Sequence, residues 1–294
     1  MKSSQSLKWI LVFAAASSVI IAQDAAPIRR ELKAGSTETY KIENEIKQFV
    51  EVPSMGEQDL TINTIATVAL KTLAVNAEKG NAEVEALTKV EKLSMDGSIA
   101  GMMGDQSGAK LPAPKTEKGT LDSRNRLSIA KDPKAKPSAN AMMGMPGLSE
   151  IGAQSLLTLI ELPEKAWKVG DTAQVGVPGA AGAATMGVKE LKMTMTISGE
   201  KEVEGQKLWV VTYSGSMKID FDSSKNPQAG QSAAGNMKMN GTAEVTGEGL
   251  VDKATGKTVG NTLKVSNKGT MFIEQAGMEI PVRGTVSMKL TLVK

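Results

Sequence analysis

The sequence predicts a mainly β protein with two tandem repeats of long, curved antiparallel strands, shaped like a half-barrel or open barrel, with one helix between the repeats. Three observations support this fold class. Apolar and polar residues alternate over long runs, short motifs recur at nearly constant spacing, and one apolar stretch lacks alternation. The chain has 294 residues, 40% of them hydrophobic, which is enough to bury a substantial core.

The first 22 residues read as a secretory signal peptide. Lys2 and Lys8 precede a mostly apolar run that ends at Ala22. This run is shorter than the about 20 residues that a membrane-spanning helix needs. We expect a secreted or periplasmic bacterial protein, because the chain has no cysteine to form the disulfides common in other secreted proteins. Cleavage is expected near Ala22, and an uncleaved signal would be the only contact with a membrane.

The rest of the chain contains a duplicated pattern. Leu32–Thr37 recurs 135 residues later as Trp167–Thr172, and the turn sequence Gly-x-x-Asp occurs at Gly119 and again 130 residues later at Gly249. Recurrence at similar offsets indicates an internal repeat. We therefore expect two β-rich repeats, at 23–162 and 163–294.

Long strands are predicted by alternation with a period of two residues. The runs are 60–75, 84–95, 188–203, 207–221 and 280–292. In the first run the apolar phase changes, which predicts a bulge near Lys71 and Thr72. A strand of 13 residues is roughly 43 Å long at about 3.3 Å per residue, so such strands must twist and the sheet should curve strongly.

A helix is predicted at about 149–162, the C-terminal part of the first repeat. This stretch is rich in Leu and Ile, lacks alternation, follows Pro146-Gly147 and ends before Pro163. We expect it to pack on one face of a sheet.

The composition excludes several functions. The chain contains no His and no Cys, so it cannot form a Ser-His-Asp triad, a Cys nucleophile or a typical zinc site. Cationic and anionic residues number 35 and 32 and are interspersed, and only 3% of residues are aromatic. This pattern does not favour nucleic acid as a partner. We expect a protein that is not an enzyme, with no catalytic residues and no cofactor.

The second repeat offers candidate residues for binding an apolar ligand. Small residues between Met237 and Val251 leave room above the sheet, to be filled by the helix or by something bound. The residues expected to line a concave, lipid-binding face are Met193, Met195, Trp209, Val211, Tyr213 and Met239. The expected partner is a lipid-like apolar molecule or an envelope protein. The alternative is a structural envelope protein with a filled core.

Methionine is unusually abundant, with 17 residues. Thioethers select soft ions, so the loop cluster Met142, Met143 and Met145 is a candidate Cu(I) site and Cu(I) binding is a third function hypothesis. Methionine also serves as flexible core filler. We assign no other metal site.

The signal sequence, the Lys-x-Gly-(Ser/Asp)-Thr motif of each half, the string Leu162–Thr172 and the two Gly-x-x-Asp turns resemble a family of bacterial extracytoplasmic proteins of unknown function with two β-rich repeats. The resemblance implies an envelope location and no particular activity. The expected architecture is more distantly similar to periplasmic lipoprotein and lipid carriers.

Overall fold

A computed structural model describes residues 26–53, 55–102, 111–130, 153–176, 188–222 and 236–293. These residues form one antiparallel sheet of 11 strands whose two edges do not meet. The protein is therefore mainly β with long antiparallel strands, as the alternation predicts. Within the described ranges, no helix is both long and apolar enough to cross a bilayer.

The strands are long, and most exceed 15 residues. In the first half they are β1 (Thr37–Val52), β2 (Gly56–Asn76), β3 (Asn81–Asp96), β4 (Lys115–Asp122) and β5 (Leu127–Ile129). The later strands are β6 (Thr172–Val175), β7 (Val188–Val203), β8 (Gln206–Asp222), β9 (Met237–Asp252), β10 (Thr258–Ile273) and β11 (Met278–Val293). The short helical elements are α1 (Ser98–Met102), α2 (Ala153–Leu156) and the 3-10 turn η6 (Glu274–Ala276).

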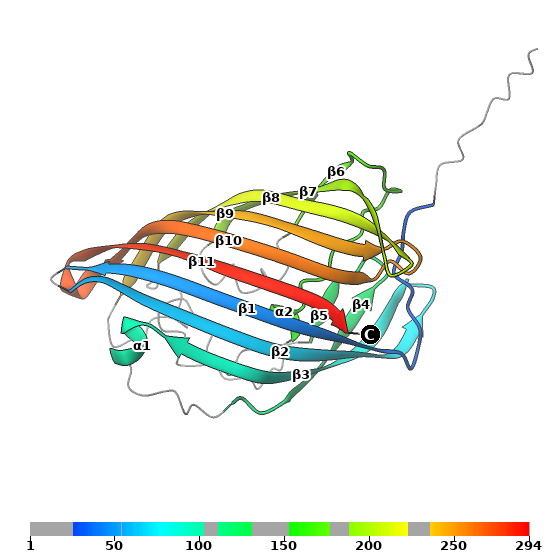
Figure 1. Ribbon diagram of the computed structural model, residues 1–294, viewed down its shortest axis with the longest axis horizontal. Helices are drawn as coiled ribbons and strands as arrows, with labels where there is room; N and C mark the ends of the chain where they lie inside the picture. The colour runs from blue at the N-terminus through cyan, green and yellow to red at the C-terminus, as the bar shows by residue number, and fades with distance from the viewer. Residues whose placement is uncertain are drawn as a thin grey trace, which may run out of the picture.

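Both halves belong to the same continuous sheet. Its strand order is β5-β4-β3-β2-β1-β11-β10-β9-β8-β7-β6, so β11 lies between the first strand and the tenth. β11 pairs with β1 from Thr39–Val293 to Val50–Val282, almost the full length of both strands. Figure 1 shows this central pair, with β4, β5 and α2 lying behind it as the sheet curves.

Alternation gives the sheet an apolar inner face. Along β2, every second side chain from Leu60 to Leu70 is buried, and the intervening ones are partly exposed. The pairing of β2 with β3 shifts register between Thr72 and Ala74, which confirms the bulge predicted near Lys71 and Thr72. Leu73 is the extra, unpaired residue of this bulge, and it is 38% exposed.

The two halves are built alike at the recurring motifs. In the first half the Gly35 N–H donates to the Thr72 carbonyl (2.9 Å), and in the second the Gly170 N–H donates to the Ile197 carbonyl (2.8 Å). Both glycines have positive φ, and a register shift follows each acceptor. In each Gly-x-x-Asp turn, the carboxylate of Asp122 or Asp252 accepts backbone N–H groups just after it. The recurring sequences thus encode the same turns.

The predicted helix at 149–162 is mostly wrong. Helix covers only Ala153–Leu156, and residues 157–162 are neither helix nor strand. The apolar residues of this stretch do pack on the sheet, but from a non-helical backbone. Residues 149–152 lie outside the described ranges.

Candidate ligand-binding face

One end of the inner face is filled by the segment 157–167, here called the crossing segment. Its first part packs into a cluster with strands of the first half through Leu157 and Leu159. Its second part packs into a cluster with strands of the second half through Ile160, Leu162 and Trp167. The segment therefore joins the cores of the two halves.

Side chains that are distant in sequence form hydrogen bonds with the backbone of the crossing segment. The Ile160 N–H donates to the Thr258 hydroxyl (2.9 Å), and the Asn261 amide donates to the Thr158 carbonyl (2.7 Å). Asn125, held at φ 66°, donates to the Ile160 carbonyl (2.9 Å). Buried backbone groups outside helices and strands need such partners, so these contacts fix a non-helical path.

A buried polar network seals the same end. Arg30, only 4% exposed, forms an ion pair with Glu38 and donates to Oδ1 of Asn125 (2.7 Å). Tyr40 donates to Glu38 (2.8 Å), and Lys257 Nζ lies 3.3 Å from the other Glu38 oxygen. Every one of these charges is paired, which is the condition for burying them. We assign this network a structural role.

Five of the six predicted lining residues come together. Met193, Met195, Trp209, Val211 and Tyr213 share one buried cluster. Their space is taken by Ile160, Leu162 and Trp167 of the crossing segment, and the Trp167 and Trp209 rings meet edge to face at 6.0 Å. The structure shows these five residues as packed core at this end.

The remaining predicted positions lie elsewhere. Met239 belongs to a different cluster, with Val50, Ile280 and Val282. Met142, Met143 and Met145 fall outside the described residues.

Three buried polar atoms of the second-half cluster lack a hydrogen-bond partner within the described part of the chain. They are the Tyr213 hydroxyl and the indole N–H groups of Trp167 and Trp209. Burial also raises the pKa of Tyr213 above its usual value. Lys253 Nζ lies 4.2 Å from the centre of the Trp209 ring.

Beside the two clusters that contain the crossing segment, the inner face carries apolar side chains that stay half-buried, and Met217, Val265 and Met288 pack against those clusters. We call these residues the central belt: Ile46, Met217, Ile219, Val265, Val286 and Met288. The contrast appears within single strands. On β11, Leu290 beside the crossing segment is 1% exposed, whereas Met288 and Val286, two and four residues earlier, are only partly buried. The same change separates Ile42 from Ile46 on β1.

The central belt is continuous across β1, β11 and β10, and it is uncharged. Ile46 pairs with Val286, and Val286 pairs with Val265. The polar inner-face side chains nearest to these three are the neutral amides Asn44, Gln48 and Asn267. The sequence prediction missed the belt because it chose lining residues that the crossing segment covers, and it did not foresee which part of the apolar face this segment would leave half-buried. The alternation of 280–292 already placed Val286 and Met288 on the apolar face.

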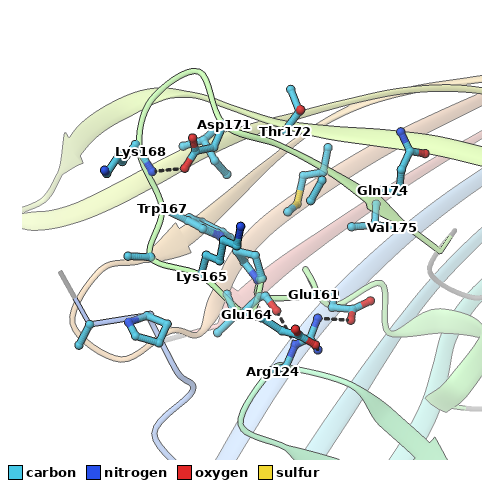
Figure 2. A pocket seen from close by; sticks show the side chains of 18 residues that line it. Arg124, Glu161, Glu164, Lys165, Trp167, Lys168, Asp171, Thr172, Gln174 and Val175 are labelled. Carbon is cyan, nitrogen blue, oxygen red and sulfur yellow. Dashed lines mark hydrogen bonds and ion pairs between the residues drawn. The ribbon is translucent and has the colours of Figure 1, made fainter. Parts of the chain in front are cut away.

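A pocket of about 840 Å³ lies beside β6 at the edge of the sheet (Figure 2), and Leu162, Trp167 and Met195 of the second-half cluster contribute to its lining. Arg124 lines this pocket. Its guanidinium forms ion pairs with Glu161 (2.9 Å) and Glu164 (2.8 Å) and donates a hydrogen bond to the Leu162 carbonyl (2.8 Å). The remaining charged lining residues are Lys165, Lys168 and Asp171. Three cations and three anions balance, so the pocket has no net charge to attract an ion. The described residues also contain no group of three or more His, Cys, Asp or Glu side chains that could hold a metal ion.

No protein-family model and no curated protein matches the chain. Among solved structures, DynF from the dynemicin biosynthesis pathway of Micromonospora chersina is 10% identical, with 99% of this chain and 92% of DynF covered and a TM-score of 0.20. A triple mutant of the Rh. blastica porin is 11% identical, with 86% and 99% covered and a TM-score of 0.25. Scores this low carry no argument about fold or function.

Proposed function

We propose that the chain is a non-enzymatic extracytoplasmic carrier that binds a flexible acyl chain along the central belt. The observation that carries this proposal is the change in exposure along single strands. The inner face is sealed where the crossing segment covers it, and it presents half-buried apolar side chains farther along. Removing apolar surface of this kind from water is favourable, so a ligand that covers it is stabilised in the bound state.

The character of the belt favours an acyl chain over other apolar ligands. It consists of aliphatic and methionine side chains, which adapt to a flexible ligand, and it contains no aromatic residue for stacking on rings or sugars. The amides of Asn44, Gln48 and Asn267 are uncharged, so no described residue at the centre of the belt would form an ion pair with an ionised headgroup. The headgroup would therefore remain outside.

The predicted signal at 1–22 supports the extracytoplasmic location. Expression in a bacterium followed by fractionation and mass spectrometry of the N-terminus tests this part. We expect the protein in the periplasmic fraction, beginning after Ala22. Recovery of the intact chain from the cytosol would contradict the location but leave the binding proposal standing.

A fluorescent fatty acid tests the binding. The belt variant Val265→Asn/Val286→Asn places two amides on the inner face, whereas the control Ser266→Asn/Ser287→Asn changes their outward-facing neighbours. We expect the belt variant to bind at least about tenfold more weakly, or about 1.4 kcal/mol, and the control to bind like the unchanged chain. Circular dichroism confirms that both variants keep the sheet. Equal affinities, or no binding by the unchanged chain, would refute the carrier.

A further inference from the structure

Methionines gather at the end of the sheet opposite the crossing segment. Met239 on β9, Met271 on β10 and Met278 on β11 all pack against one small buried group, Val50, Ile280 and Val282. We call these three methionines the methionine rim. Met237 belongs to the same end of β9.

The strand register brings the rim residues close together. Met239 pairs directly with Met271. Met271 in turn pairs with Ile280, which places Met278 diagonally across from it on β11. Direct partners lie about 5 Å apart and diagonal ones about 7–8 Å, within reach of long side chains. Because methionine has three rotatable side-chain bonds, three sulfur atoms can converge above Met271.

The rim is half-buried. All three side chains are partly accessible, in contrast to Met193 and Met195, which are 0% and 1% exposed in the sealed cluster. Partial exposure would admit an ion, and the buried neighbours Val50, Ile280 and Val282 are aliphatic. The buried pair has no such access and acts as core filler.

We propose that Met239, Met271 and Met278 form a thioether site for Cu(I). Soft sulfur ligands select this ion over harder cations. The chain offers no thiolate or imidazole that would hold it more tightly, since it contains neither Cys nor His. The site lies apart from the central belt and does not depend on the carrier function.

Titration with Ag(I), a redox-stable substitute for Cu(I), tests the site in the full chain labelled with 13C at the methionine methyl groups. We expect the methyl signals of the three rim residues to shift and to saturate at one equivalent of Ag(I). The variant Met239→Leu/Met271→Leu/Met278→Leu preserves apolar volume and should bind at least about tenfold more weakly. The control Met193→Leu/Met195→Leu should bind unchanged.

Each other result contradicts the proposal. Unchanged Ag(I) affinity in the rim variant would remove these residues as ligands. Shifts confined to Met142, Met143 and Met145 would assign binding to the loop cluster, and Zn(II) producing the same shifts would exclude a soft-ion site. If the triple variant fails to fold, the single variant Met271→Leu and the assigned methyl shifts of the unchanged chain decide the question.

Discussion

Arg30 and Glu38 form an ion pair that is almost entirely removed from water, with side chains 1% and 12% exposed. Neutralising one partner of a buried pair leaves the other charge uncompensated, which costs about 3–5 kcal/mol. We expect Glu38→Gln to lower the free energy of unfolding by this amount in urea denaturation followed by circular dichroism. The control Glu43→Gln breaks an exposed pair with Lys41 and should cost less than about 1 kcal/mol. Similar decreases in the free energy of unfolding of the two variants would show that the buried pair stabilises the fold no more than the exposed pair does.

Tyr40 and Tyr213, the two tyrosines of the chain, should resist ionisation. Burial raises the pKa of both phenols above the ordinary value of 10.0, although Arg30 partly opposes this at Tyr40. Above about pH 10 the unfolded chain loses phenolic protons that the folded chain keeps, so the folded state loses stability as the pH rises further. Below pH 10 this contribution is fully present.

An alkaline absorbance titration measures this effect. We expect the phenolate signal to appear only when the chain unfolds. The variant Tyr40→Phe/Tyr213→Phe should show a shallower fall in stability between pH 10 and 11 than the unchanged chain. A phenolate signal with a midpoint near 10 in the folded chain would contradict the burial of these hydroxyls.

Glycines within β9 and β10 permit the close approach of neighbouring strands. A Cβ atom at Gly241 would lie 2.6 Å from the Lys268 carbonyl oxygen, and Gly241 pairs directly with Gly269. We expect Gly241→Ala to destabilise the chain by about 1–3 kcal/mol, because the contact is with backbone that cannot move independently. Gly199→Ala in β7 is the control, since a Cβ there meets nothing within 4 Å. Thermal unfolding measures the stability of both variants. Equal destabilisation of Gly241→Ala and Gly199→Ala would exclude this role of Gly241.

The strands were predictable where the chain alternates over long runs. The run at 188–203 coincides with β7, and the run at 280–292 lies within β11. β1 was not predicted, because its inner face mixes Tyr40 and Ile42 with the amides of Asn44 and Gln48, so its pattern is weak.

The crossing segment was mistaken for a helix for a physical reason. A short apolar run bounded by proline fits a helix and a buried extended segment equally well. What decides between them is the partners of its backbone groups, and these come from Asn125, Thr258 and Asn261. The Arg30 network was missed for the same reason, since it depends on contacts between distant parts of the chain.

The two halves should unfold as one unit, because β11 pairs with a strand of each half. Trp167 and Trp209 report on the second half, so a Trp9→Phe background isolates their fluorescence. In that background, Ile42→Ala on β1 should cost about 2–5 kcal/mol and shift the fluorescence and circular dichroism midpoints together. A fluorescence midpoint that stays in place while the circular dichroism midpoint moves would show that the halves unfold independently.

The position of β11 also affects how the protein is made. β1 acquires its second neighbour only when residues 278–293 are available, because Thr39 pairs with Val293. Until the ribosome has synthesised that stretch, β1 and β10 each expose an unpaired edge, and contacts this distant in sequence form slowly. The nascent polypeptide therefore cannot complete its sheet until this last strand emerges.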